Sequence, residues 1–589
     1  MTGIMMSQPL YISDIKVICG SMTSLIKKSF GPKGAKLMLT SSSGQAIVTK
    51  DGMSILSSVH YSHPVSKCIL DSLGSFCEAY GDGCKAFIIY LYSLFEAIEH
   101  EHTFQDYWSL SNSLLEFLKH DFVNITEQLT GIVSSQNKLN IMEEEWLDQH
   151  SVFYLLKTYF CNSFSRNDVY NLSKLLANYV AKIGARRCSL SAVLQWFDNF
   201  VFFSKESYTS SQYEDGIFLK GAFPLKYPYN KTSNAILMQC PFEIDSKCYT
   251  REDTVMQLTE KIITYPAQVA ALFLSMLKKH HVTLVLTIHK VSDYILQMAS
   301  SMSINVVPCL EDTDLEFIMC ATGKVGVSAM WDELEASCLV AVTSYQSVDI
   351  SGQQYVKIVL DRPPLDFPRS TLFLCAPTDS LCKELKYNVK KGLKLISHCL
   401  PEICECNLRL NKVCLFHGDL KSCNNEEQQL TDTNQRVIKS CMNVEQHLED
   451  IKLPLSFKLV AGGGYFDYLL IDCLTKYMNK NVQLSPKRLM WCRLVVKMLL
   501  ALPQNLYENL SVCKPSLQKS NYLRTYSSVK EALDHNKIVG FCSSDSVSNP
   551  LKHGVWECLD QKLATVSQVL HLAGVLLGAD AVIAAKTNH

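Results

Sequence analysis

The first part of the chain has apolar positions at helical spacing. Apolar residues recur every three to four positions over residues 12–30, and this run stops at Gly31-Pro32-Lys33-Gly34. Two short apolar stretches, 36–40 and 45–49, are typical of the strands of a hairpin. Helical spacing returns after Asp51-Gly52 and continues with few glycines to about residue 200. The pattern predicts a mostly helical N-terminal region.

The middle of the chain has a different pattern of apolar residues. Residues 235–240, 282–288 and 304–308 are apolar runs of strand length, and residues 291–302 have helical spacing. Strands that alternate with helices are typical of an α/β domain. After a helix predicted for residues 380–398, helical spacing dominates again from residue 466 to the end. We therefore predict an α/β domain inserted into a helical one.

A polar stretch interrupts the second helical region. Residues 405–450 are rich in Asn, Gln, Lys and Glu, which is typical of a long surface insertion. Five side chains in or just before it are of types that bind zinc. Their spacing matches no paired Cys-x-x-Cys knuckle in a chain that is cysteine-rich throughout, so a zinc site stays an alternative here. These residues are Cys404, Cys406, Cys414, His417 and Cys423.

Charge and cysteine content narrow the class of protein. The 56 Lys and Arg residues nearly equal the 57 Asp and Glu residues, so the chain lacks the basic excess that nucleic-acid binding requires. The 24 cysteines are scattered among apolar residues, which is typical of buried thiols in a reducing compartment. We find neither a secretory signal nor a membrane-spanning run. The composition predicts a cytosolic globular protein with more than one core.

Four glycine-containing segments are candidates for chemistry. Gly31-Pro32-Lys33-Gly34, Asp51-Gly52, Gly81-Asp82-Gly83 and Gly462-Gly463-Gly464 each stand at the end or start of a predicted helix or strand. Glycine lets backbone N–H groups approach a phosphate, and a neighbouring carboxylate can hold Mg²⁺. Each segment also fits an ordinary turn, and the triple glycine indicates close approach of either a ligand or a neighbouring backbone.

The order of these and other segments along the chain resembles the signature segments of group II chaperonins. Within that group, the chain is most similar to the divergent chaperonin-like branch of Bardet–Biedl syndrome. The resemblance covers nearly the whole chain apart from the polar insertion. The segments that carry it are Ser29-Phe30-Gly31-Pro32-Lys33-Gly34, Thr49-Lys50-Asp51-Gly52, His63-Pro64, Gly81-Asp82-Gly83, Pro377-Thr378-Asp379, Ala461-Gly462-Gly463-Gly464, Ala501-Leu502-Pro503-Gln504-Asn505-Leu506 and Gly554-Val555-Trp556-Glu557.

The resemblance implies an α+β multidomain protein with the group II chaperonin fold. A mostly helical equatorial domain would be built from both chain ends, with an intermediate hinge domain and an α/β apical domain between them. The implied boundaries are equatorial 1–120 and 451–589, intermediate 121–203 and 361–402, apical 204–360, and a polar insertion at 403–450.

The resemblance also implies a site for ATP or ADP with Mg²⁺ in the equatorial domain. Asp82 would hold Mg²⁺, and Asp51 would help to position the attacking water. The other implied nucleotide-binding residues are Gly31 and Pro32 along the phosphates, Gly81 and Gly83 beside Asp82, Gly462 and Gly463 behind the nucleotide, and Glu557 near the ribose.

Four residues depart from the family pattern. One is Glu557, which stands where the family usually has an aspartate. Cys84 and Lys85 stand where the family has threonines that contact phosphate, and Lys391 stands where it has a catalytic aspartate. Lysine is not a general base at neutral pH unless its pKa is strongly depressed, so we interpret Lys391 as a solvated lysine on a helix face. Loss of this carboxylate predicts that ATP hydrolysis is weak or absent, although ATP binding is compatible with the change.

The resemblance implies a molecular chaperone for the BBSome, a ciliary trafficking complex. Its expected partners are BBSome subunits, related chaperonin-like proteins and subunits of the cytosolic chaperonin, in the cytoplasm near the basal body and cilium. Nucleic acid and a membrane span are not expected. Two alternatives remain at this point: an active ring-forming ATP-dependent chaperonin, and a nucleotide-free scaffold.

Overall fold

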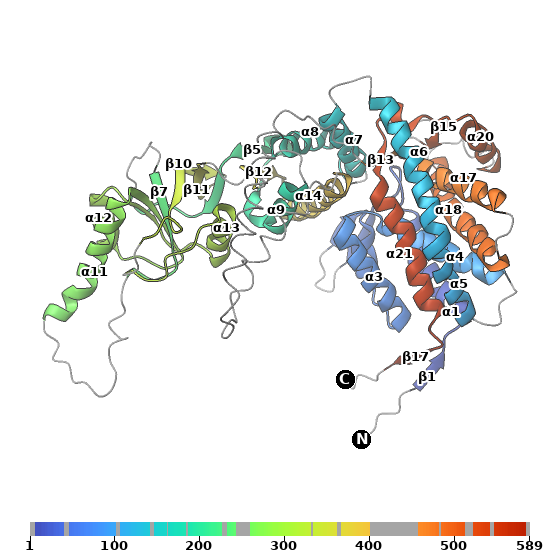
Figure 1. Ribbon diagram of the computed structural model, residues 1–589, viewed down its shortest axis with the longest axis horizontal. Coiled ribbons are helices and arrows are strands. Elements are labelled where there is room, and N and C mark those ends of the chain that lie inside the picture. Colours follow the sequence, from blue (N-terminus) through green and yellow to red (C-terminus); the bar gives the residue numbers. More distant parts are fainter. Residues whose placement is uncertain are drawn as a thin grey trace, which may run out of the picture.

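A computed structural model shows an elongated molecule with three units in a row (Figure 1). Both chain termini lie in the unit at one end, and the middle of the chain forms the unit at the other end. We name these units equatorial, intermediate and apical after the domains expected from the sequence. The structure describes residues 6–584 except 41–45, 102–106, 142–146, 162, 184–186, 226–232, 243–259, 331–333, 351, 362–366, 401–457, 482–484, 513–521 and 542–546.

Helices from both ends of the chain share one core in the equatorial unit. Helix α4 (Cys84–His100) contacts α1, α18 and α21, and its side chains from Phe87 to Leu91 are all buried. A helix that is apolar on all sides is stable only when other helices surround it. The helices of this unit are α1 (Ile12–Lys27), α2 (Gly52–Ser57), α3 (Pro64–Tyr80), α4, α5 (Tyr107–Glu116), the π-helix η1 (Phe117–Phe122), α6 (Val123–Ile141), α17 (Tyr465–Lys480), α18 (Pro486–Val512), α20 (Tyr522–Asp534), the 3-10 helix η4 (Pro550–His553) and α21 (Leu559–Leu577).

Short strand pairs tie distant segments of the equatorial unit together. The C-terminal region, which the sequence predicted to be helical, also contains strands of only two to four residues. One pair joins the two ends of the chain, and the hairpin expected near residue 40 forms as β2–β3. The antiparallel pairs are β1 (Met6–Pro9) with β17 (Ala581–Ala584), β2 (Leu37–Thr40) with β3 (Ala46–Thr49), β13 (Leu459–Ala461) with β16 (Trp556–Cys558), and β14 (Gly540–Phe541) with β15 (Val547–Ser548).

The intermediate unit packs helices against a three-stranded sheet. Strand β12 is central: it runs parallel to β4 and antiparallel to β5, and all six of its residues are buried. Helix α14 packs against α7 and α9 on this unit and also contacts α3 of the equatorial unit. The elements are α7 (Leu147–Phe160), α8 (Arg166–Lys182), α9 (Arg187–Gln195), α10 (Phe197–Phe200), β4 (Val201–Ser204), η2 (Tyr208–Ser210), β5 (Gln212–Asp215), β12 (Ser370–Cys375) and α14 (Asp379–Cys399).

The apical unit is a six-stranded mixed sheet in the order β6-β11-β10-β7-β8-β9 with helices on both faces. Alternation along β8 shows the two faces, because Leu284 and Leu286 join the core shared with α13, and Val285 joins the core under α11 and α12. The elements are β6 (Ile217–Lys220), β7 (Ser233–Met238), α11 (Glu260–Lys279), β8 (Val282–Thr287), α12 (Asp293–Ser301), β9 (Asn305–Val307), α13 (Asp312–Thr322), β10 (Val340–Ile350) and β11 (Gln353–Leu360).

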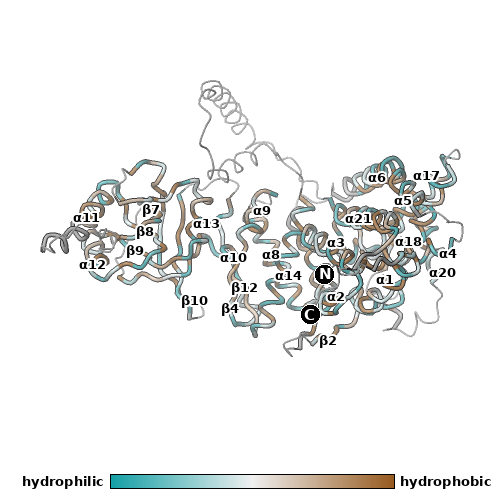
Figure 2. Tube along the Cα trace, turned by 90° about the horizontal axis from the view of Figure 1, so that it is seen from below, coloured by the Kyte–Doolittle hydropathy of each residue, from teal (hydrophilic) through white to brown (hydrophobic). Residues whose placement is uncertain are grey.

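Packing shows which unit each segment joins. Helix α6 begins inside the expected intermediate segment, yet its residues Ile125, Leu129 and Val133 pack in the equatorial core. Strand β5, inside the expected apical segment, pairs with β12 of the intermediate unit. The polar insertion and its candidate zinc ligands lie outside the described residues. Seen from below, the three units again follow one another along the long axis, with apolar positions along the elements of each (Figure 2).

Buried thiols and the absence of long apolar helices mark the described part of the chain. Cys19, Cys399 and Cys492 are fully buried among apolar side chains. Within the described residues, every helix is too short or too polar to cross a bilayer.

Candidate functional site

Asp51 lies at the junction of the equatorial and intermediate units. Its backbone is extended, and its Oδ2 atom accepts hydrogen bonds from the Ser54 amide at 2.7 Å and the Ser54 hydroxyl at 2.8 Å. Asp51 is therefore the N-cap of α2, which satisfies a backbone donor that the helix itself leaves free. The other carboxylate oxygen, Oδ1, faces α14.

The side chain that meets this oxygen is Lys391. Its ammonium Nζ donates to Asp51 Oδ1 at 2.8 Å, and Nζ also lies 4.0 Å from the ring centroid of Tyr387. Tyr387 in turn donates its hydroxyl to Asp51 Oδ2 at 3.3 Å. The Lys391 side chain is only 11% exposed, so the expectation of a solvated lysine was wrong. Helix α14 turns this residue toward the equatorial unit, where a carboxylate takes the place of solvent.

Both members of this pair are charged at neutral pH. Burial raises the pKa of Asp51, but the charge and hydrogen bond of Lys391 and the Ser54 donors outweigh it, so the net pKa is lowered. Burial lowers the pKa of Lys391, but the charge of Asp51 outweighs it and the net pKa is raised. A protonated lysine cannot take a proton from water, so Lys391 is not a general base in this arrangement.

The Gly81-Asp82-Gly83 loop lies against the same helix. Gly81 has φ +80°, and a Cβ atom there would lie 2.4 Å from the carbonyl oxygen of Lys391. Gly83 has φ +99°, and its Cβ would lie 2.2 Å from Nε2 of Gln561, which donates to the Asp82 carbonyl at 3.3 Å. Close packing on two sides therefore requires both glycines. The Asp82 side chain stays exposed.

The two residues after this loop fill space beside Asp51. A Cβ atom on Gly52 would lie 2.8 Å from Lys85 Cγ and 2.9 Å from Cys84 Sγ. Lys85 Nζ donates to the Ser29 carbonyl at 2.8 Å, and burial lowers its pKa to about 8, against the opposing charges of Asp82 and Asp51. A hydrogen bond to Cys77 and burial raise the pKa of the Cys84 thiol. Cys84 and Lys85, the two residues predicted to depart from the family pattern, are thus packed against Gly52 and bound to other parts of this chain.

The turn after α1 presents its backbone to solvent on one side. Gly31 has φ +80°, and a Cβ atom there would lie 2.7 Å from Leu506 Cδ1. Pro32 and Lys33 are exposed, and the Asn509 side chain donates to the Phe30 carbonyl at 2.9 Å. The bond from Lys85 to Ser29 places this turn next to the Asp51 cluster.

The triple glycine is packed by the chain itself. A Cβ atom on Gly462 would lie 2.8 Å from Val555 Cγ1, and one on Gly463 would lie 2.6 Å from the Phe541 carbonyl oxygen. The Phe541 amide donates to the Gly463 carbonyl at 2.8 Å. The sequence left open whether a ligand or a neighbouring backbone lies close to these glycines. In the structure, neighbouring segments of the chain do. Glu557 pairs with Lys562 at 3.0 Å.

The sequence analysis missed a buried carboxyl group, Asp467, near the pair of Glu557 and Lys562. Asp467 is fully buried, accepts the hydroxyl of Tyr90 at Oδ1, and has no hydrogen-bond partner at Oδ2 among the described residues. Burial raises its pKa to about 7, although the charge of Lys562 opposes the rise. The available signal was a single acidic residue within the apolar run Tyr465-Phe466-Asp467-Tyr468-Leu469.

We next compare the cluster of Asp51, Lys391, Ser54 and Tyr387 with what ATP and Mg²⁺ require. Magnesium takes carboxylate oxygens that are free to coordinate it, together with the phosphates. Both oxygens of Asp51 are held by Lys391, Ser54 and Tyr387, and no group of three or more metal-ligating side chains occurs in the part of the chain that the structure describes. Asp82 is exposed. The arrangement does not fit a metal at Asp51.

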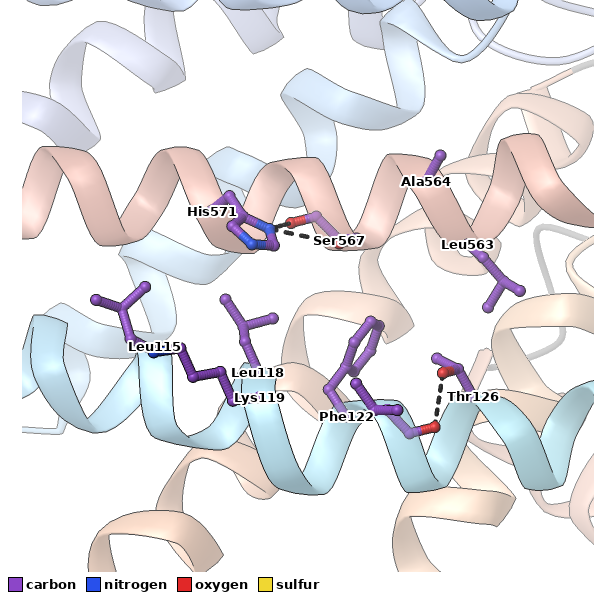
Figure 3. A pocket seen from close by; sticks show the side chains of 10 residues that line it. Leu115, Leu118, Lys119, Phe122, Thr126, Leu563, Ala564, Ser567 and His571 are labelled. Atoms are coloured by element: carbon purple, nitrogen blue, oxygen red, sulfur yellow. Dashed lines mark hydrogen bonds between the residues drawn. The ribbon is translucent and has the colours of Figure 1, made fainter. Parts of the chain in front are cut away.

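A separate hollow lies between η1–α6 and α21 (Figure 3). Its volume is about 570 Å³, and Leu118 and Phe122 on one side point toward α21, which carries Leu563, Ser567 and His571 on the other. Lys119 and His571 are among its polar residues, and His571 Nδ1 lies 2.7 Å from the Ser567 carbonyl of its own helix. The lining is mostly apolar and contains no carboxylate, so the hollow does not extend the Asp51 cluster.

Comparisons with known proteins agree with this architecture. A model of the TCP-1/cpn60 chaperonin family matches residues 22–402. BBSome complex assembly protein BBS10 of Mus musculus is 23% identical over 421 residues, or 65% of this chain and 57% of that protein. The Homo sapiens protein of the same name is 21% identical over 430 residues, with 65% and 56% covered. T-complex protein 1 subunit gamma of Arabidopsis thaliana is 22% identical over 400 residues, with 64% and 66% covered.

A solved structure matches over almost the whole chain. The crystal structure of a group III chaperonin in the open state has a TM-score of 0.66 and 13% identity, and the match covers 97% of this chain and 98% of that one. This match confirms the predicted chaperonin fold, and the BBS10 matches confirm the predicted resemblance to the Bardet–Biedl branch. The chain spans 57% of the mouse relative's length. The protein belongs to the TCP-1/cpn60 chaperonin family.

Proposed function

We propose that this protein is a chaperonin-like chaperone that assists the folding and assembly of BBSome subunits, with ATP hydrolysis weak or absent. The relatives named BBSome complex assembly protein support the class of client. The observation that carries the proposal is the ion pair of Lys391 with Asp51, 2.8 Å apart. It puts a cation where the family supplies its catalytic carboxylate.

The ion pair removes two functions that phosphoryl transfer needs. Phosphoryl transfer depends on positioning of the attacking water and on metal-bound charge near the phosphates. The ammonium of Lys391 compensates the charge of Asp51 and binds its Oδ1 atom, which leaves this carboxylate less able to orient an attacking water. Lys391 keeps its proton because its pKa is raised, so no general base replaces the missing aspartate.

Nucleotide binding is a separate part of the proposal. The turn with half-buried Gly31 and exposed Pro32 and Lys33, together with the exposed Asp82, supplies the groups that ATP or ADP with Mg²⁺ would contact. Binding there would bias the conformation rather than drive a cycle of hydrolysis. The packing of Cys84 and Lys85 against Gly52 favours a second candidate, a scaffold that binds no nucleotide.

The apical unit supplies a surface for clients. Leu272 on α11 and Tyr294 on α12 are 71% and 60% exposed, and these two helices contact each other. We propose these two exposed side chains as contacts for a client protein. BBSome subunits, related chaperonin-like proteins and cytosolic chaperonin subunits are the partners we propose, in the cytoplasm near the cilium.

A capture experiment tests the proposal. The purified protein is immobilised and offered β-propeller subunits of the BBSome without nucleotide, with ADP and with ATP. We expect similar capture in all three conditions, and a severalfold loss in the double variant Leu272→Asp/Tyr294→Asp. The matched control is Leu523→Asp, which changes a side chain that is 66% exposed on the equatorial helix α20.

Two results would contradict the proposal. Recovery of no BBSome subunit by the folded protein would remove the client, and capture that requires ATP hydrolysis would favour the active chaperonin. Calorimetric titration with ATP or ADP and Mg²⁺ distinguishes the two remaining candidates, a nucleotide-biased chaperone and a nucleotide-free scaffold. Binding that Asp82→Ala abolishes supports a nucleotide-biased chaperone, whereas no binding by folded wild type supports the scaffold.

A further inference from the structure

Helix α14 belongs to the intermediate unit through one of its faces. The apolar residues on this face are buried in the core that the intermediate unit shares with the apical sheet. Their spacing of four and seven residues keeps them on one side of a helix that turns 100° per residue. They are Leu385, Val389 and Ile396.

A polar stripe follows the opposite face of the same helix. Tyr387, Lys391 and His398 each lie two positions after one of the buried apolar residues, which is a rotation of about 200°. Lys394 lies on the stripe between Lys391 and His398. These four side chains contact the equatorial unit. The helix therefore has one face in each unit.

Lys394 and His398 bind the carboxyl end of α3. Lys394 Nζ donates to the Glu78 carbonyl, and the His398 ring nitrogen Nε2 lies 2.9 Å from the Ala79 carbonyl. The last carbonyls of a helix have no partner within it, and donors at this end also complement the helix dipole. The His398 ring stacks on Tyr80, with ring centroids 4.5 Å apart.

Lys391 and Tyr387 bind the amino end of α2. Both contact Asp51, the cap of that helix, so the ion pair joins the start of α2 to the middle of α14. Between these contacts, the Gly81 backbone lies against the Lys391 carbonyl. The polar stripe of α14 thus contacts a continuous row of equatorial residues, from Asp51 to Tyr80.

We propose that the polar stripe of α14 is an intramolecular latch, which holds the equatorial and intermediate units in one arrangement without a bound ligand. The ammonium of Lys391 compensates the charge of Asp51 from within the chain, at 2.8 Å. This inference concerns the relation of the two units, so it stands or falls independently of the client and of nucleotide hydrolysis.

Hydrogen–deuterium exchange and small-angle X-ray scattering test the latch on the full-length protein without nucleotide. Lys391→Met should speed amide exchange in residues 52–57 and 81–83 by about tenfold and broaden the distribution of interdomain distances. Asp51→Asn should have the same effect, because asparagine still caps α2 but lacks the charge. The matched control is Lys383→Ala, which removes an exposed lysine of α14 and should change neither measurement.

The double variant Asp51→Asn/Lys391→Met sharpens the test. If the two residues act through one another, its exchange is no faster than that of either single variant. Rates that multiply, or a folded Lys391→Met protein with unchanged exchange and scattering, would overturn the latch. If Lys391→Met does not fold, His398→Ala decides: faster exchange at residues 76–83 supports the latch, and unchanged exchange overturns it.

Discussion

Two ion pairs of the molecule, Asp121 with Arg488 and Asp51 with Lys391, differ in what they join. Asp121 is fully buried on the π-helix η1, and it accepts hydrogen bonds from Arg488 Nε at 2.6 Å, from a second guanidinium nitrogen and from the Tyr477 hydroxyl at 2.6 Å. All three residues belong to the equatorial unit. This pair fixes helices within one core.

The pair of Asp51 with Lys391 has similar chemistry in a different place. Its side chains are 20% and 11% exposed, and they come from helices of two units. It joins the two units and compensates the charge of a carboxylate of the predicted nucleotide site. The structural role of a buried ion pair therefore depends on which elements it connects as much as on its burial.

The largest effect is expected inside the equatorial core. Asp121→Ala leaves the Arg488 guanidinium without its carboxylate and should lower the free energy of unfolding of that unit by about 3–5 kcal/mol. Chemical denaturation followed by tryptophan fluorescence measures this, because Trp491 is buried nearby on α18. The control is Asp71→Ala, an exposed position on α3. Equal losses in both variants would refute the structural role of Asp121.

The next effect depends on pH and concerns Asp467. Its folded-state pKa is raised to about 7, so the folded state holds this proton more tightly than the unfolded chain does. Stability contributed by the proton is full below about pH 4 and is lost as pH rises to 7. From pH 5 to 8 we expect wild type to lose about 2 kcal/mol more than Asp467→Asn. If the stabilities of the two proteins changed with pH in parallel, this would contradict the raised pKa of Asp467.

A smaller effect is expected at the boundary between the units. Gly81→Ala forces a Cβ atom against the Lys391 carbonyl at φ +80° and should cost about 1–2 kcal/mol. Gly131→Ala is the matched control: it lies within α6 with open space around it, and it should stabilise the protein by up to about 1 kcal/mol. Thermal denaturation compares the two variants, and a neutral Gly81→Ala would mean that the units do not meet there.

The smallest effect on stability is expected at Asp82. Its side chain is exposed, so Asp82→Ala should change the free energy of unfolding by less than about 0.5 kcal/mol. A large loss would show that Asp82 supports the fold, and its use as a probe of nucleotide binding would then fail. Denaturation curves at pH 7 with and without EDTA check this point.

The contrast between the regions also shows what a sequence can predict. Helical spacing located α1 and α14 within a few residues, because their apolar faces are long and regular. Strands β13, β14 and β16 escaped prediction, since two or three residues are too few to show alternation. The glycine loops were found from their residues, but their packing partners, such as Phe541 and Gln561, lie far along the chain.

Lys391 shows why the site itself was harder to predict. The count along α14 identified the position, but whether a polar face meets water or another domain depends on contacts from residues more than 300 positions away. The stripe of Tyr387, Lys391, Lys394 and His398 was visible as spacing, although nothing in that spacing named Asp51 as the partner. Asp467 was equally visible as a single carboxylate in an apolar run.

Steady-state ATP hydrolysis by the purified protein with Mg²⁺ tests the central claim most directly. Lys391 stands where the family resemblance implies a catalytic carboxylate, and it is paired with Asp51. We therefore expect turnover of wild type to equal that of Asp82→Ala, at the background level. Magnesium-dependent turnover by wild type that Asp82→Ala abolishes would contradict the account and show that the ion pair opens during a working cycle.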